Sequence, residues 1–172
     1  HRPRRPMKRT KLINDPAELV ALFRSVDSPG RRAVLARLAE GWTPISELQE
    51  KFGEEAFSSI TYFEKFKLVE SRWEVRDGKP EKAYRTFYNA FQISTSFSFE
   101  ETQELLTVVL MDEAVFEALE VKILEMVGEE GGFANDISRE LELTSLQLKG
   151  LVRRSVKFDY KGHNIVLIKE EK

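Results

Sequence analysis

Apolar residues recur at helical spacing through the first part of the chain and predict four short helices. The first begins at Asp15 and Pro16, an N-cap residue followed by a proline at the first helical position. The second begins in the same way at Ser28 and Pro29. The expected helices start near residues 15, 28, 43 and 54 and end near residues 26, 41, 53 and 67.

After these helices the apolar spacing changes from helical to alternating. An expected strand over residues 69–76 alternates between a largely apolar side and a charged side. The dipeptide Asp77–Gly78 predicts a tight turn before a return strand over residues 82–93. Helices followed by a two-stranded hairpin are typical of a winged helix-turn-helix domain.

Two more helices are expected over residues 99–111 and 113–127. From Val34 onward, the apolar skeleton of the first part recurs in the last third of the chain, shifted by 89 residues and then by 92. A helix over 145–157 and short strands over 157–160 and 164–168 complete this repeat, which predicts a second winged helix by pattern and not by residue identity. Capping boxes mark the start of two of these helices, at Ser98 with Glu101 and at Thr144 with Gln147.

The predicted fold class is therefore α+β and mainly α, with tandem winged helix-turn-helix domains joined by a helical segment. The expected parts are a basic N-terminal arm over residues 1–11, a first winged helix-turn-helix domain over 12–95, a helical linker over 96–112 and a second winged helix-turn-helix domain over 113–172.

Composition limits the possible functions. The chain has 172 residues, of which 41% are hydrophobic and 33% charged, as in a soluble globular protein. No apolar run is long enough to span a bilayer or act as a secretory signal, so a cytoplasmic protein without membrane contact is expected. There is no cysteine, and the two histidines are His1 and His163, so no metal site, disulfide or cofactor is expected. Phosphate-binding glycine loops and nucleophile motifs are also missing, which predicts that the protein is not an enzyme.

The small net charge of -2 hides a strongly uneven distribution. Residues 1–11 carry six basic side chains and no acid, residues 98–142 carry thirteen acids against two bases, and residues 143–169 carry six bases against one acid. The two basic ends are candidate polyanion-binding surfaces. The arm, with Arg2 to Arg5, resembles extensions that enter minor grooves, although Met7 inside it would make a natural start.

A helix fits the DNA major groove, and a wing can follow the phosphates beside it. On the helix over 145–157, Lys149, Arg153 and Lys157 are four residues apart and share one face, while Gly150 permits close approach to a backbone or another helix. The candidate DNA-binding residues are Ser58, Ser59, Thr61, Tyr62 and Lys65 on the helix over 54–67, Arg76, Lys79, Lys82 and Arg85 around the first hairpin, Lys149, Arg153, Arg154 and Lys157 on the helix over 145–157, and Lys161 and His163 at the second hairpin tip.

Each of these sets has an alternative interpretation. The cations can simply solvate the outer side of an amphipathic helix, and those of the first wing can protect a strand edge against pairing. His163 is either a phosphate contact or an idle surface group. Glu54 and Glu55 at the start of the first recognition helix repel phosphates, unless they read a cytosine amino group.

The first ninety residues resemble the archaeal branch of the ArsR-type winged-helix transcription regulators. The resemblance is carried by DPAELVALFRSVDSPGRRAVLARLAEG, TPISELQEKFG, FEKFKLVES and WEVRDGKPEKAYR. It implies a cytoplasmic, usually dimeric regulator that contacts DNA through Ser58, Ser59, Tyr62, Lys65 and the wing. Metal sensing is not implied, because members that sense metals use cysteine or histidine ligands that this chain lacks. The whole chain is similar to euryarchaeal regulators of archaellum genes.

The predicted function is that of a sequence-specific double-stranded DNA-binding transcription regulator, a homodimer that acts at promoters. The alternative is a winged-helix protein-interaction module within the transcription machinery, because the same fold also serves as a scaffold. The acidic segment over residues 98–142 favours this alternative, and basal transcription factors are its expected partners.

Overall fold

The computed structural model describes residues 9–169, which divide into two compact units. Unit 1 comprises residues 9–14 and 25–94, and unit 2 comprises residues 15–24 and 95–169. The expected boundaries differ from this division in two places. Residues 15–24 belong with the C-terminal unit, and the expected linker over 96–112 is part of unit 2, because both segments pack on its helices.

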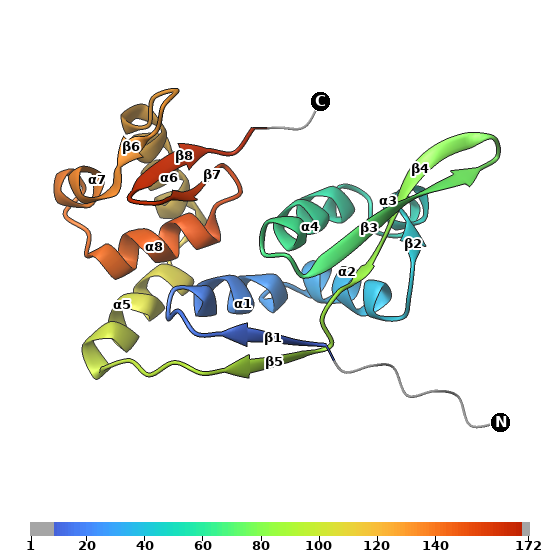
Figure 1. Cartoon of the computed structure of the whole chain (residues 1–172), viewed down its shortest axis with the longest axis horizontal. Helices are drawn as coiled ribbons and strands as arrows, with labels where there is room; N and C mark the ends of the chain where they lie inside the picture. Colours follow the sequence, from blue (N-terminus) through green and yellow to red (C-terminus); the bar gives the residue numbers. More distant parts are fainter. Residues whose placement is uncertain (1–8, 170–172) are drawn as a thin grey trace. The chain divides into compact units, whose positions relative to one another are not determined.

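Unit 1 contains a winged helix-turn-helix of the α+β class (Figure 1). Ser28 caps its first helix by accepting a hydrogen bond from the Arg31 amide at 3.1 Å. A single residue, Gly53, separates the second and third helices. Its φ of 61° is in the left-handed region, which glycine adopts without steric cost. The elements are α2 (Pro29–Ala39), β2 (Thr43–Pro44), α3 (Ile45–Phe52), α4 (Glu54–Lys65), β3 (Val69–Arg76) and β4 (Lys79–Thr86).

The sheet of unit 1 has the strand order β2-β4-β3, and the hairpin of β3 and β4 is antiparallel throughout. Asp77 and Gly78 form its turn, as the sequence predicts, both with positive φ. The base of the hairpin packs on the helices, where Ala83 and Tyr84 are buried, and its outer part extends beyond them (Figure 1). The buried side chains of the helices include Val34, Leu38, Leu48, Ala56, Ile60 and Phe63.

A second sheet in unit 1 differs from the sequence prediction. The expected return strand over 82–93 is broken after Thr86, and its last part is a separate strand, β5 (Ala90–Ile93), which pairs in parallel with β1 (Thr10–Ile13). Thr10 and Lys11 of the expected arm therefore belong to a strand, and Arg2, Arg4, Arg5 and Lys8 lie outside the described residues.

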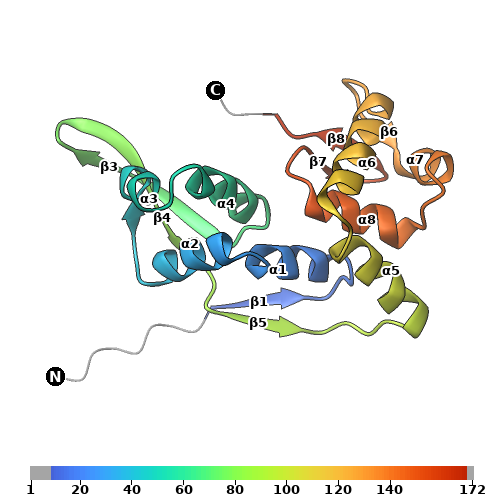
Figure 2. The same cartoon turned by 180° about the vertical axis from the view of Figure 1, so that it is seen from behind.

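Unit 2 repeats the element order of the winged helix-turn-helix, and its sheet order β6-β8-β7 corresponds to β2-β4-β3 (Figure 2). Both capping boxes form as the sequence predicts. The helix expected over 145–157 ends at Arg154. The elements are α5 (Phe99–Val109), α6 (Glu113–Met126), β6 (Gly132–Phe133), α7 (Ala134–Glu140), α8 (Ser145–Arg154), β7 (Phe158–Lys161) and β8 (Asn164–Leu167); residues up to Arg24 of α1 (Glu18–Val26) also belong to this unit.

Candidate nucleic-acid interface

Helix α4 of unit 1 presents one exposed side at helical spacing. Ser58 and Thr61 are exposed on this side, and Lys65 is half-buried at its end. Phe57, which the sequence analysis did not select, is 52% exposed beside them. The signal was available, because Phe57 lies one helical turn before Thr61 and outside the stripe that Ala56, Ile60 and Phe63 form at helical spacing in the sequence.

Ser59 and Tyr62 do not lie on this exposed side, and the prediction that they face outward is wrong. Ser59 is fully buried, and its hydroxyl donates a hydrogen bond to Glu55 Oε1 at 3.2 Å. Tyr62 is 1% exposed, with the Arg31 guanidinium 4.3 Å from its ring centroid. The buried stripe of α4 is wider than the sequence prediction, so it includes polar residues adjacent to the apolar ones.

The cations of the first wing fall into two groups. Arg85 forms an ion pair with Glu70, and its guanidinium lies 4.5 Å from the centroid of the Trp42 ring. Arg76 and Lys79, next to the turn, are exposed, and neither forms an ion pair within residues 9–169, although the charge of Arg76 contributes to lowering the pKa of Glu81. The positive charge available to a polyanion is therefore concentrated at the tip of the wing.

In unit 2 the helix that corresponds to α4 is covered. Gly150 of α8 is buried, and a Cβ atom placed on it would lie 3.3 Å from the side chains of both Val108 and Val20. Helix α5 and the first part of α1 thus pack directly on the outer side of α8. The sequence expectation that Gly150 permits close approach of another helix is confirmed, and Ser145 and Lys149 are the exposed residues of α8.

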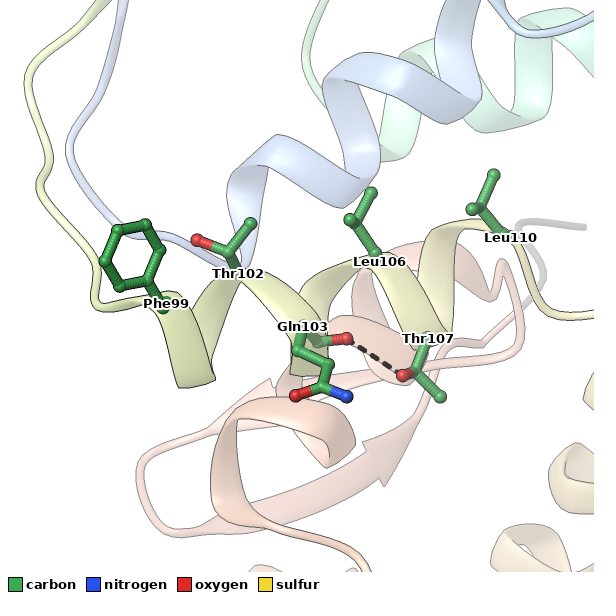
Figure 3. A pocket seen from close by; sticks show the side chains of 6 residues that line it. All are labelled: Phe99, Thr102, Gln103, Leu106, Thr107 and Leu110. Carbon is green, nitrogen blue, oxygen red and sulfur yellow. Dashed lines mark hydrogen bonds between the residues drawn. The ribbon is translucent and has the colours of Figure 1, made fainter.

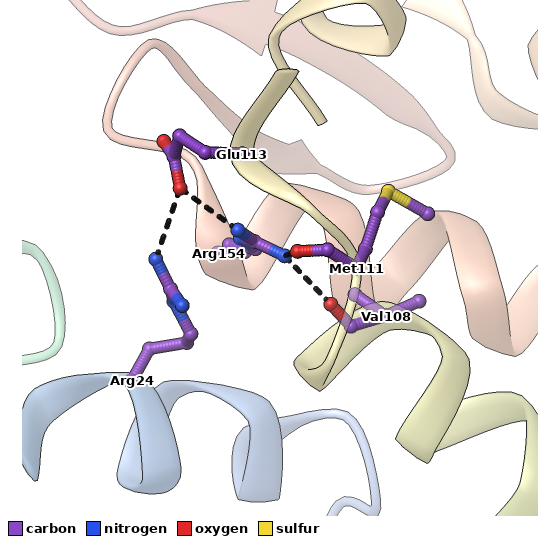
Figure 4. Close-up of polar contacts among 5 residues, drawn as sticks. All are labelled: Arg24, Val108, Met111, Glu113 and Arg154. Carbon is purple, nitrogen blue, oxygen red and sulfur yellow. Dashed lines mark hydrogen bonds and ion pairs between the residues drawn. The ribbon is translucent and has the colours of Figure 1, made fainter. Parts of the chain in front are cut away.

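Arg154, at the end of α8, is also covered by neighbouring segments of unit 2 (Figure 4). Its Nη1 donates hydrogen bonds to the carbonyl oxygens of Val108 at 2.9 Å and Met111 at 2.8 Å, and its Nη2 lies 2.9 Å from Glu113 Oε2. The side chain is 1% exposed. The prediction that Arg154 projects from the surface is therefore wrong, because it binds carbonyls that the end of α5 leaves without helical partners.

The other basic residues of unit 2 are partly neutralised. Arg153 lies 3.6 Å from Asp159, and Lys157 lies 3.7 Å from the buried carboxylate of Glu120. Four predicted residues of this unit remain exposed, namely Lys149 on α8, Lys157 just after it, and Lys161 and His163 at the hairpin tip.

Each unit has a tyrosine in its hairpin whose pKa is raised, Tyr84 being buried and Tyr160 half-buried. Burial, together with the nearby Glu64 carboxylate that accepts its hydrogen bond, raises the pKa of Tyr84 to about 12. Burial also raises the pKa of Tyr160 to about 12, with Arg153 acting in the opposite direction and Asp15 in the same one. Both phenols are neutral at physiological pH.

Helix α5 has a second, uncovered side. A shallow pocket on it contains no charged side chain, and Phe99, Leu106 and Leu110 are 97%, 47% and 76% exposed (Figure 3). The residues that line this α5 face are Phe99, Thr102, Gln103, Leu106, Thr107 and Leu110.

Within residues 9–169, the acidic side chains and His163 form no group that could hold a metal ion. None of the helices in this part of the chain is long and apolar enough to cross a membrane.

The family model described as ArsR transcriptional regulator matches residues 13–169. A search of curated proteins finds no match to the chain.

Proposed function

The chain belongs to the ArsR family of transcriptional regulators, and from this premise we propose that unit 1 binds double-stranded DNA at promoters in a sequence-specific manner. The observation that carries this proposal is the open side of α4 in the same fold as a wing with a basic tip. Ser58 and Thr61 supply hydroxyls for base edges, and Phe57 supplies an apolar contact for a thymine methyl group. Lys65, Arg76 and Lys79 supply charge for phosphates.

The proposal is tested by fluorescence anisotropy with promoter fragments from the source genome over a series of salt concentrations. Because each neutralised phosphate releases counterions, replacing Arg76 and Lys79 together by alanine should lower the slope of log affinity against log salt by about two. Lys149→Ala with Lys161→Ala in unit 2 is the matched control and should leave the slope nearly unchanged. If no promoter fragment binds with salt sensitivity, the proposal fails.

We further propose that unit 2 is a second winged helix whose role is assembly and not DNA reading. Its element order and sheet order support the first part, and the cover over α8 supports the second. The uncharged α5 face suits a second copy of the same chain, since a two-fold axis through it would set apolar side chains on apolar side chains without burying a charge. Leu106→Glu with Leu110→Glu should then convert a dimer into a monomer in light scattering, and a wild-type monomer at micromolar concentration would refute this part.

A protein-interaction module is the second candidate, and one observation favours it. Glu54 and Glu64 are exposed on α4, where carboxylates repel phosphates. If α4 binds a basic partner such as a basal transcription factor, Glu54→Lys and Glu64→Lys will abolish the protein complex. If α4 binds DNA, the same changes will strengthen DNA binding.

The most specific part of the proposal concerns the genes that the protein controls. Resemblance to archaeal regulators of archaellum genes supports that class of target. Genome-wide mapping of the binding sites in the source organism tests it, and sites confined to unrelated promoters would refute it.

A further inference from the structure

The two faces of the unit 1 hairpin carry different chemistry. Residues directly opposite each other in the β3–β4 pairing share a face, so Trp73 lies beside Lys82 and Val75 beside Pro80. We call these four residues the apolar wing face. No acidic residue lies on this side of the hairpin over its whole length. All three acids of the two strands lie on the other side, namely Glu70, Glu74 and Glu81.

The apolar wing face is open where a domain core would normally cover such residues. Trp73 is 67% exposed and Val75 is 77% exposed. Nearer the base on the same side, Tyr84 is 6% exposed and interacts with Glu64 of α4. The face therefore begins at α4 and becomes exposed outward along the hairpin, so it adjoins the helix that is proposed to read DNA.

The carboxylates on the opposite side are already held by groups of the same unit. Glu70 pairs with Arg85, and Glu74 pairs with Arg72 at 2.7 Å. Glu81 accepts a hydrogen bond from the Ser46 amide at 2.9 Å, and its hydrogen bonds to Ser46 lower its pKa. A polyanion would meet three carboxylates on that side. On the apolar wing face it would meet none.

One cation lies on the apolar wing face, and two more lie on the other side of the hairpin next to the turn. The Lys82 ammonium lies 5.6 Å from the centroid of the Trp73 ring, whereas Arg76 and Lys79, which are directly opposite each other, belong to the other side. A planar, apolar ring with a cation beside it and no carboxylate on its face suits the floor of a DNA minor groove, where apolar side chains enter between base steps and cations bind the flanking phosphates. A basic protein partner would be repelled by these cations, and an acidic one would not need the indole ring.

We propose that the apolar wing face enters the minor groove beside the α4 site, with Trp73 as a wedge that partly unstacks a base step and bends the duplex. Val75 widens the wedge, Lys82 binds a phosphate on this face, and Arg76 and Lys79 bind phosphates from the other side of the hairpin. This proposal rests on the proposed DNA-binding function of unit 1. It adds a specificity that depends on how easily a sequence deforms, because flexible pyrimidine–purine steps cost the least to unstack.

The test uses a fluorescein-labelled duplex selected by the full-length protein from a random-sequence pool, and the same duplex with a donor and an acceptor dye at its two ends. Wild-type protein should bind and increase energy transfer between the ends. Trp73→Ala should weaken binding about tenfold and abolish the increase, and Trp73→Phe should retain part of both. Lys79→Ala is the matched control on the same hairpin, and it should weaken binding with the bend preserved.

A single-tryptophan protein gives an independent readout. Trp42→Phe leaves Trp73 as the one fluorophore of its kind, because the chain has two tryptophans. Its emission should become inaccessible to an aqueous quencher when the duplex binds. Because Trp73 is exposed, its variants should retain the wild-type melting temperature, which circular dichroism checks.

The outcomes separate the two proposals. If the selection yields no bound duplex, the proposed function itself fails. If the wild type binds but does not bend the duplex, or Trp73 stays accessible to the quencher, the wedge is overturned and the proposed function stands. Loss of a protein complex in Trp73→Ala, with DNA affinity and bending unchanged, would also overturn it.

Discussion

Helix α4 of unit 1 and helix α8 of unit 2 occupy the same place in the same order of elements, yet different things lie on their outer sides. Shifting α4 by 92 residues superposes its buried positions Ala56 and Ile60 on Leu148 and Val152 of α8. The same shift places Ser58, which is exposed, on Gly150, which is buried beneath valines of α1 and α5.

The comparison shows that the shared element order determines which residues of such a helix are buried. The outward residues can differ, and with them the contacts that the helix makes. In α4 the outward side carries hydroxyls and a phenyl ring open to a ligand. In α8 it carries a glycine that admits two other segments and, at the end, an arginine that binds the carbonyls of one of them. The outward side of α4 is therefore open to a ligand, whereas that of α8 contributes to the packing of unit 2.

The largest expected effect comes from filling the space beside Gly150. A leucine at this position would press on Val20 and Val108, which are at close range even for a Cβ atom, so Gly150→Leu should lower the free energy of unfolding by about 3 kcal/mol. Ser58→Leu is the matched variant on α4. It should change stability little and reduce DNA binding. Chemical denaturation followed by circular dichroism measures both, and equal stability losses would show that the two outer sides do not differ.

A somewhat smaller loss is expected from Arg154→Met. The methionine keeps much of the packing on Phe116 but donates no hydrogen bonds, so the Met111 carbonyl loses the bond from Arg154 and the Val108 carbonyl keeps only bonds from its own turn, such as that from the Met111 amide at 3.4 Å. The expected cost is about 2 kcal/mol. Arg76→Met on the exposed wing is the control, with stability unchanged. Hydrogen exchange should show faster exchange in α5 for Arg154→Met alone. Unchanged exchange there would contradict the role assigned to Arg154.

The sequence predicts the helices, both hairpins and both capping boxes, because these depend on local spacing and on residues a few positions apart. It does not predict β1, since the pairing of Thr10–Ile13 with Ala90–Ile93 joins segments that are distant in sequence. It also fails at Arg154. The sequence does not show whether a cation at the edge of a helical stripe is solvated by water or donates hydrogen bonds to the end of a neighbouring helix.

Burial of Ser59 and Tyr62 has a related cause. Serine and tyrosine are common on recognition surfaces, so their chemistry favoured exposure. Their position beside the apolar residues of α4 decided the outcome, and both are buried. The signal that does separate the two units in the sequence is Gly150. A glycine in the middle of an otherwise amphipathic helix costs about 1 kcal/mol of helix propensity, which favours a packing role over a solvated face.

Substitutions on the open side of α4 should have smaller effects, and these should change DNA affinity and not the stability of the protein. Thr61→Ala should weaken binding to the selected duplex about tenfold through lost base contacts, while leaving binding to an unrelated duplex nearly unchanged. Arg153→Ala, at the corresponding position of α8, should leave both affinities unchanged. Anisotropy titrations measure all of these. A loss for Arg153→Ala as large as that for Thr61→Ala would mean that unit 2 also reads DNA.

The smallest effect concerns Tyr84 and Tyr160, whose neighbouring charges have opposite signs, Glu64 beside Tyr84 and Arg153 beside Tyr160. Because their folded pKa of about 12 lies above the ordinary value of 10, both stabilise the fold below pH 10 and lose this contribution as the pH rises from 10 to 12. Glu64→Gln removes a negative charge and should lower the pKa of Tyr84, whereas Arg153→Gln removes a positive charge and should raise the pKa of Tyr160. Titration of the tyrosine ring carbons by NMR measures each pKa separately. Shifts in the same direction would show that burial alone governs both phenols, and that the charges near the two tyrosines do not distinguish the units.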